Sequence, residues 1–469
     1  MTLATRPPLV RIPRDGALPV SYTQRERLET GRGVYLPNNT VTISLRFDGP
    51  FDLDVLSRTV SAVVARHEGL RVVFPTDQRA ALIEPSGCLR VAEVGPDCPD
   101  PYAAAIDLLS ADAQVPFDLA AGPLFRCLAV RVDETTHLLG IAIDHVIADG
   151  WSCNLLVRDL LGTYEALRHG EEPELPPLPV QHLDFVAWEL AYLSGGAEER
   201  LLDYWRTALG STDPIPDSGL VDVSVPADAP ATLERVRHPL ADGFRQRLAR
   251  FAAACRITPY AVLGAALSAA VLTQRRADGV PSADDVALFA SFGNRTHATV
   301  QDAFGYFATP GTLRTDLSGD PDFTELVRRQ ARTVSGALRH QELPHAVVVR
   351  ELRPDQYGCR YRGGAGPATR YLNFDLAQQR ARPFGFGVRG LTASMISVPR
   401  PDTPRGGLRL LAYQLESSMD LELRYRTDRY SAPWAERFSD RMRQILYDGV
   451  ADPSQPLSTL GKLADRSTS

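Results

Sequence analysis

The chain of 469 residues is long enough for two domains or for one large unit with two lobes. Its apolar fraction of 44% and charged fraction of 23% are globular values, which excludes a largely disordered chain, a collagen and a coiled coil. The chain has 51 Lys and Arg and 57 Asp and Glu, so its net charge is −6. The overall charge therefore lacks the basic excess that is typical of nucleic-acid-binding proteins.

The predicted elements of the first half alternate between strands and helices. Alternating apolar residues predict a strand over 42–48, and Asp52 is a plausible N-cap for the helix that follows it. A second helix is expected to end near residue 114 and a third to run over 151–168. Further strands are predicted at 71–74, 81–85, 123–132 and 137–145.

A proline-rich segment, EEPELPPLP at residues 171–179, is the best linker in the chain because its prolines forbid a continuing helix. Strands and helices also interleave after it. We therefore predict an α/β protein with an N-terminal lobe at 1–180 and a C-terminal lobe at 181–469.

The N-terminus and the cysteines bear on where the protein is expected to reside. Residues 1–16 have no apolar core of the signal-peptide kind, and the longest apolar stretch, 260–272, is too short to span a bilayer. The six cysteines show no CxxC pair and no zinc spacing, so we expect reduced thiols and no metal site. We expect a soluble cytoplasmic monomer that binds neither membrane nor nucleic acid.

Residues 141–152, IAIDHVIADGWS, are the segment most suited to chemistry. Strand alternation places His145 at the end of a strand and Asp144 on the opposite face. A histidine beside a turn closed by Asp149 and Gly150 can project into a cleft, and glycine lets a ligand approach the backbone. From spacing alone, a structural histidine and an Asp149 that caps a helix or forms an ion pair are the commoner interpretations.

DHVIADGWS resembles the HHxxxDG signature of the condensation-domain superfamily of nonribosomal peptide synthesis, which CoA-dependent enzymes such as chloramphenicol acetyltransferase share. PVSYTQRERL (19–28) resembles the S-x-x-Q-x-R-L motif of that family, with one extra residue before Arg27. Other similar segments follow in family order: RHEGLRVVF (66–74), VPFDLAAGPLFRCLAVRV (115–132), LDFVAWE (183–189), LDYWRTALG (202–210), FASFGNRT (289–296), FGYFATPGTLR (304–314), HQELPHAVVVREL (340–352) and LELRYRTDRYSAPWAERF (421–438).

This resemblance implies two chloramphenicol-acetyltransferase-like lobes, set as a V-shaped pseudo-dimer around a tunnel that donor and acceptor enter from opposite faces. It implies that His145 acts at the reaction centre. Gly150 matches the signature glycine, with two interpretations: its N–H faces the developing oxyanion, or it is a simple turn residue. Asp149 and Arg295 match a structural ion pair of the family. Residues expected to border the substrate tunnel are Trp151, Tyr306 and Thr309.

The sequence also departs from the family pattern. Asp144 stands at the first His of the signature, and we expect it to support the site from behind rather than to react. Thr309 and Pro310 replace an Asn and a Thr, and His345 replaces a Phe. These changes indicate a donor or acceptor other than a standard peptidyl chain.

The resemblance implies a free-standing condensation enzyme that joins an acyl or aminoacyl group from a carrier-protein thioester to the amine or hydroxyl of a small soluble acceptor. The expected partners are an acyl or peptidyl carrier protein and that acceptor. We expect no cofactor bound by the chain itself, since the donor would ride on the phosphopantetheine of a separate carrier. The alternatives are a CoA-dependent acyltransferase, a non-catalytic recruitment domain and, less favoured, an epimerising relative.

Overall fold

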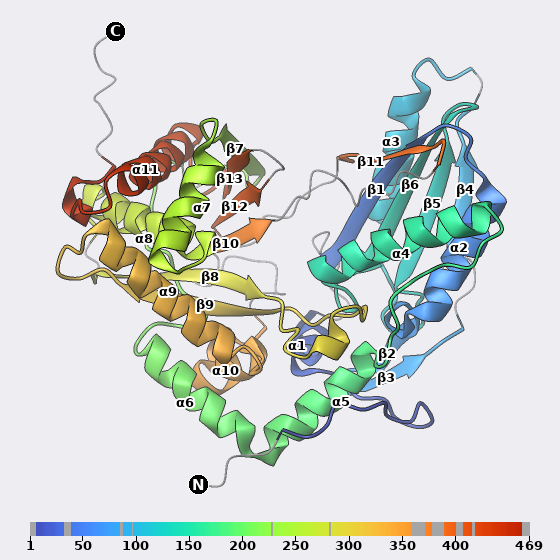
Figure 1. The fold of residues 1–469 in the computed structure, drawn as a ribbon, viewed down its shortest axis with the longest axis horizontal. Helices are drawn as coiled ribbons and strands as arrows, with labels where there is room; N and C mark the ends of the chain where they lie inside the picture. The colour runs from blue at the N-terminus through green and yellow to red at the C-terminus, as the bar shows by residue number, and fades with distance from the viewer. Residues whose placement is uncertain are drawn as a thin grey trace. The chain divides into compact units, whose positions relative to one another are not determined.

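The computed structural model describes residues 6–31, 39–84, 88–95, 97–226, 228–280, 283–358, 371–377, 389–399, 407–414 and 418–461. The chain divides into two compact units (Figure 1). Unit 1 comprises residues 1–199, 293–308 and 382–402, and unit 2 comprises 200–292, 309–381 and 403–469. The sequence prediction sets the boundary at residue 180 and does not anticipate the two later segments that belong to unit 1.

Unit 1 is built on a five-stranded sheet in the order β11-β1-β6-β5-β4. Strand β6 pairs antiparallel with both β1 and β5, and β4 runs parallel to β5. The strands of unit 1 are β1 (Thr40–Asp48), β2 (Val72–Thr76), β3 (Arg79–Leu82), β4 (Leu89–Glu93), β5 (Phe125–Arg131), β6 (Thr136–Asp144) and β11 (Thr392–Met395). Its helices are α1 (Tyr22–Gly31), α2 (Leu53–Arg66), α3 (Pro101–Ala113), α4 (Gly150–Arg168) and α5 (His182–Tyr192).

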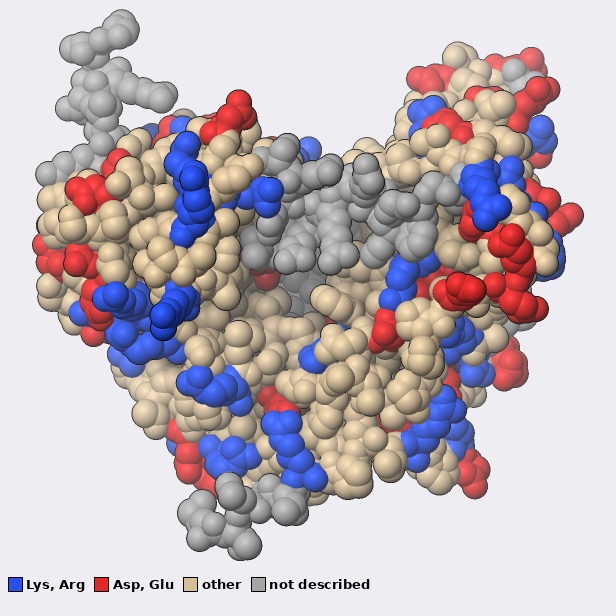
Figure 2. Space-filling view, viewed as in Figure 1, with Lys and Arg blue, Asp and Glu red and all other residues tan. Residues whose placement is uncertain are grey.

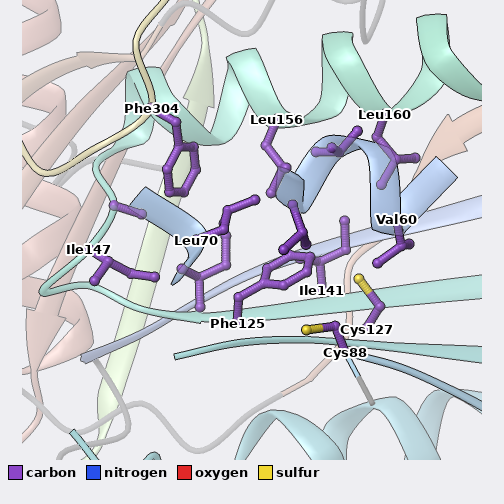
Figure 3. Packing of buried hydrophobic residues seen from close by; sticks show 14 of the residues in the cluster. Val60, Leu70, Cys88, Phe125, Cys127, Ile141, Ile147, Leu156, Leu160 and Phe304 are labelled. Atoms are coloured by element: carbon purple, nitrogen blue, oxygen red, sulfur yellow. The ribbon is translucent and has the colours of Figure 1, made fainter. Parts of the chain in front are cut away.

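The main core of unit 1 lies between the sheet and helices α2 and α4, while α3 covers the other face (Figures 1 and 3). Asp52 caps α2 by accepting the N–H groups of Asp54 and Val55. Val60 of α2 and Leu156 and Leu160 of α4 then meet the strand residues that point the same way, among them Ile141 (Figure 3). This packing fixes where β6 ends and α4 begins.

Unit 2 contains a six-stranded sheet in the order β7-β13-β12-β10-β8-β9. Helices α8, α9 and α11 pack on one another and on its strands. The strands are β7 (Leu233–Pro239), β8 (Asp285–Phe292), β9 (Thr309–Asp316), β10 (Leu372–Ala377), β12 (Leu408–Gln414) and β13 (Met419–Arg426). The helices are α6 (Glu198–Leu209, which starts in unit 1), α7 (Phe244–Cys255), α8 (Pro259–Ala277), α9 (Phe323–Arg339), α10 (His345–Leu352) and α11 (Ala432–Ala451).

Both units repeat one pairing pattern. In unit 1 the hairpin β5–β6 has β1 antiparallel on one side and β4 parallel on the other, and helix α4 follows it. In unit 2 the hairpin β12–β13 has β7 antiparallel on one side and β10 parallel on the other, and α11 follows it. Each hairpin joins its helix through five residues, 145–149 in unit 1 and 427–431 in unit 2.

The predicted α/β class is confirmed in both units, and most of the predicted strands are present. Strand β4 is missing from the prediction because LRVAE carries exposed residues of mixed polarity on an edge strand. Cys88, Cys127 and Cys153 are buried free thiols, Cys98 and Cys255 are free and partly exposed, and Cys359 lies outside the described residues. Burial raises the pKa of the Cys153 thiol to about 12, so that thiol is unreactive at neutral pH.

In the described part of the chain, no single helix is long and apolar enough to cross a membrane. Helices α7 and α8 reach that composition only as a pair, across a bend of 100°. On the face seen in Figure 2, basic and acidic side chains are interspersed over the described surface.

Candidate active site

The signature segment forms the connection between β6 and α4 in unit 1. Strand β6 ends at Asp144, and the N–H of Ile147 donates to the Asp144 carbonyl over 3.1 Å to close a tight turn. His145 is therefore the first residue after the strand, which corrects the predicted strand end by one residue. The Asp144 side chain favours this turn, because its carboxylate accepts the backbone N–H of Val146, two residues later, at 2.9 Å.

His145 is held by its backbone and leaves its ring partly accessible. Its N–H donates to the carbonyl of Asn39, just before β1, over 2.6 Å. The side chain is half-buried, and its ring meets the Tyr306 ring edge-on with centroids 4.9 Å apart. The imidazole thus lies edge-on against the Tyr306 ring, and the residue is only partly buried.

The N-terminal motif supports this turn from behind. Ser21 and Gln24 cap α1 reciprocally, each side chain accepting the backbone N–H of the other residue at 3.1 Å. The Gln24 amide then donates to the carbonyl of Val146 over 3.0 Å. The motif at residues 19–28 therefore contacts the residue next to His145, a link that spacing along the sequence does not reveal.

Asp149 is a buried N-cap with four contacts. One carboxylate oxygen accepts the Ser152 N–H at 2.8 Å and lies 3.6 Å from the Arg295 guanidinium. The other accepts the N–H groups of Phe307 and Ala308, each at 3.1 Å. Asp149 thus joins the start of α4 to the segment 293–308, which belongs to unit 1 although it lies between β8 and β9 of unit 2 in the sequence.

Arg295 is the cation of this cluster. Its guanidinium donates to the carbonyls of Val300 and Ala303 over 2.5 and 2.7 Å and stacks 4.1 Å from the centre of the Phe307 ring. Burial lowers the pKa of Arg295, and the Asp149 carboxylate acts in the opposite direction. An arginine remains charged at neutral pH under such opposing effects, so the contact with Asp149 is a buried ion pair.

Ser152 is a functional neighbour that the sequence reasoning missed. Its hydroxyl donates to the Gly305 carbonyl at 2.6 Å and accepts from the Gly305 N–H at 3.0 Å and from Arg295 at 2.9 Å. A side chain at Gly305 would lie 2.3 Å from the His182 ring, so this close approach requires glycine. No pattern singles out Ser152, because its partners lie some 150 positions later in the sequence.

His182 fixes Tyr306, the residue against which His145 packs. Its Nε2–H donates to the Tyr306 carbonyl over 3.0 Å, and its ring meets Phe307 edge-on at 4.8 Å. Burial lowers the pKa of His182 to about 4, so the ring is neutral at physiological pH. The Tyr306 ring beside His145 is thus positioned through a backbone hydrogen bond from the uncharged, fully buried His182.

Gly150 is the exposed first residue of α4, followed by Trp151. Among the described residues, no heavy atom lies within 4 Å of the position that a Cβ at Gly150 would take, so the fold does not demand glycine there. The first N–H groups of a helix have no acceptor within the helix and carry its positive dipole end. The Trp151 side chain is half-exposed and donates from Nε1 to the Gln301 carbonyl over 2.9 Å.

Thr309 belongs to unit 2 and is buried. Its hydroxyl accepts the N–H of His345, the first residue of α10, at 3.0 Å, and the His345 ring bonds the Pro214 carbonyl at 2.9 Å. Two of the departures from the family pattern are therefore partners in one local network. The predicted place of Trp151, Tyr306 and Thr309 along a substrate tunnel stays a prediction.

Comparisons with known proteins identify relatives over most of the chain. The family model of the condensation domain matches residues 37–469. Phosphinothricin tripeptide synthetase PhsB of Streptomyces viridochromogenes is 36% identical over 341 residues, which cover 70% of this chain but only 27% of PhsB. The chain therefore spans about a quarter of that relative's length.

Two solved structures share the fold. The X-domain of teicoplanin biosynthesis, solved in complex with OxyB, superposes with a TM-score of 0.80 at 22% identity, covering 98% of this chain and 99% of that one. The first condensation domain of the calcium-dependent antibiotic synthetase, solved with a substrate analogue, gives 0.71 at 21% identity and covers 96% of this chain and all of that one. The mixed α/β architecture with two open sheets is that of condensation domains.

Proposed function

The chain belongs to the condensation-domain family of nonribosomal peptide synthesis, and on that premise we propose that it transfers an acyl or aminoacyl group from a carrier-protein thioester to a small acceptor. The acceptor supplies an amine or a hydroxyl, and the product is an amide or an ester. The observation that carries the proposal is the partly exposed His145 side chain, held directly after β6 and shortly before the exposed first residue of α4.

In this proposal His145 manages the proton of the attacking group. The acceptor nitrogen or oxygen attacks the thioester carbonyl carbon while the neutral imidazole takes its proton. The tetrahedral intermediate then collapses, the carbon–sulfur bond breaks, and the proton passes to the leaving sulfur to give a free thiol. General-base assistance of this kind contributes about 10²–10⁴-fold, and orientation of the two reactants supplies much of the rest.

The other residues of the site stabilise and orient. The Gly150 N–H, at the positive end of α4, is proposed to donate to the carbonyl oxygen as it becomes negative. Asp149 and Arg295 do not react in this scheme, because both carboxylate oxygens and both terminal guanidinium nitrogens are engaged with Ser152 and with backbone groups of residues 300–308. Their role is to hold the helix start and the Tyr306 ring in register with His145.

The donor is proposed to arrive on the phosphopantetheine arm of a separate carrier protein. The chain is incubated with acyl-loaded carriers encoded near its own gene and with a panel of amines and alcohols, and products are followed by mass spectrometry. A parallel arm offers the same acyl groups as CoA thioesters, and His145→Ala serves as the matched control. Product from the loaded carrier that disappears in His145→Ala supports the proposal, whereas equal product from acyl-CoA identifies a CoA-dependent acyltransferase.

A second candidate is a recruitment domain without transfer activity, favoured by the single observation that Asp144 stands at the first His of the signature. The X-domain solved with OxyB is a member of this fold that binds another protein. The assay above separates the two functions. A recruitment domain makes no product from any donor, and His145→Ala leaves its complex with a partner intact.

A further inference from the structure

Two departures from the family pattern meet in unit 1. Asp144 replaces the first His of the signature, and Arg27 follows the extra residue in the N-terminal motif. The Arg27 guanidinium lies 3.8 Å from the Asp144 carboxylate, and each side chain is only 6% exposed. The residues are more than a hundred positions apart in sequence, so their contact does not follow from chain proximity.

Burial makes the two substitutions interdependent. A lone buried charge is strongly unfavourable, and removal of one member of a buried pair leaves the other uncompensated. A carboxylate at position 144 provides the countercharge for Arg27. A histidine there would present a neutral or cationic ring to the guanidinium instead.

The pair also acts directly on the turn that carries His145. Asp144 accepts the Val146 N–H at 2.9 Å, and Gln24 donates to the Val146 carbonyl at 3.0 Å. Gln24 and Arg27 are three residues apart on α1, so they lie on the same side of that helix. Helix α1 therefore holds the residues immediately before and after His145, one by charge and the other by hydrogen bonding.

We propose that Arg27 and Asp144 are positioning residues, a buried ion pair that sets the orientation of the His145 imidazole. The inference rests on the proposed function, since orientation matters to catalysis only if His145 takes part. Neither residue touches the substrate in this view. The pair acts by fixing the backbone on which the histidine is mounted.

The test is a double-substitution cycle on the full chain with two independent readouts. Arg27→Met, Asp144→Asn and the combined variant are compared for kcat and acceptor KM. The histidine ring resonances are recorded by NMR, with those of His145 assigned from their loss in His145→Ala. Arg25→Met is the control, because Arg25 is on the same helix and stacks on Tyr22. Arg27→Lys keeps the positive charge and serves as the conservative rescue.

We expect Arg27→Met to lower kcat by about tenfold, equivalent to about 1.4 kcal/mol of barrier, with little change in KM and with shifted His145 resonances. The combined variant should recover most of kcat, because both members of the pair are then uncharged. Arg27→Lys and Arg25→Met should keep the wild-type resonances. Unmoved His145 resonances in Arg27→Met, or strictly additive effects in the cycle, would overturn the pair. If the proposed function is wrong, the wild-type protein is inactive in the transfer assay. The His145 resonances of the variants still show whether Arg27 and Asp144 orient the histidine ring.

Discussion

The segments Asp144–Gly150 and Arg426–Ala432 occupy the same place in the two units, each joining the second strand of a hairpin to a helix through five residues. The first residue of the loop is His145 in unit 1 and Thr427 in unit 2. The Thr427 hydroxyl is tied down, donating to the Pro230 carbonyl at 2.6 Å and accepting the Thr232 N–H at 2.9 Å. The His145 ring packs against Tyr306, and the residue is partly exposed.

The last residue of each loop caps the helix that follows, but the two caps differ in their hydrogen bonds. Ser431 accepts the Trp434 N–H at 3.4 Å, whereas Asp149 makes the equivalent bond at 2.8 Å and also binds Arg295, Phe307 and Ala308. The Ser431 loop also lines a cavity of about 390 Å³ in unit 2. Because both units contain this five-residue connection, the connection by itself does not indicate a functional site. Unit 1 differs in placing a partly exposed imidazole on this connection and, at its end, a carboxylate that contacts a guanidinium and three backbone N–H groups.

The largest expected difference is in turnover. His145→Ala should lower kcat by about 10²–10⁴-fold and leave the melting temperature close to wild type, because the backbone contact with Asn39 is retained. Thr427→Ala at the equivalent position should keep kcat and lose about 1 kcal/mol of stability with its hydrogen bonds. Kinetics and thermal melting on both variants check this. Near-normal turnover in His145→Ala would remove the functional contrast between the loops.

The helix caps should differ in stability. Asp149→Ala leaves Arg295 buried without its countercharge, which should cost about 3–5 kcal/mol, and Arg295→Ala should be comparably destabilising. Ser431→Ala should cost less, about 1–2 kcal/mol, because it removes the N-cap and the hydroxyl's hydrogen bond to Asp222. Denaturant unfolding of the three variants, and of the double variant Asp149→Ala/Arg295→Ala, gives the values. A double variant much less stable than either single one would show that the pair is not coupled.

Acid should weaken unit 1 through His182. The pKa of its buried ring is lowered to about 4, so between about pH 6.5 and pH 4 the unfolded chain binds more protons than the folded one, and stability falls as the pH falls. The loss attributable to His182 should be on the order of 2 kcal/mol at pH 5 relative to pH 7. His182→Gln removes this titration, so its stability should vary less over that interval. Parallel pH profiles for the two proteins would contradict the assignment.

The smallest expected effect concerns the first helical residue. Gly150→Ala should keep or slightly raise stability, by up to about 1 kcal/mol, because alanine favours helix and nothing described obstructs its Cβ. We expect turnover to fall about tenfold, because the new methyl group would obstruct a reactant that approaches the backbone. The converse variant Ala432→Gly should lower stability slightly and leave turnover unchanged. Full activity in Gly150→Ala would reduce Gly150 to a simple turn residue.

Local patterns predicted much of this architecture. The alternation along β1 and β6, the Asp52 cap and the proline-rich segment indicated an α/β chain. The signature indicates His145 and Asp149, the FASFGNRT segment indicates Arg295, and the structure places all three in unit 1. The extra residue before Arg27 was visible in the sequence, but its partner was not. Contacts such as Gln24 with Val146 and Ser152 with Gly305 join distant segments through side chain and backbone, and no periodicity records such pairs.

The segment 293–308 has a consequence for how such a chain can be recombined. This segment lies between β8 and β9 in the sequence, yet it contacts Asp149. The residues of the site are therefore encoded in two separate parts of the chain. A crossover after residue 199 would bring His145 and Asp149 from one parent and Arg295 from the other. Functional chimaeras of relatives should therefore require both pieces from the same parent, or parents whose 293–308 segments are interchangeable around Ser152.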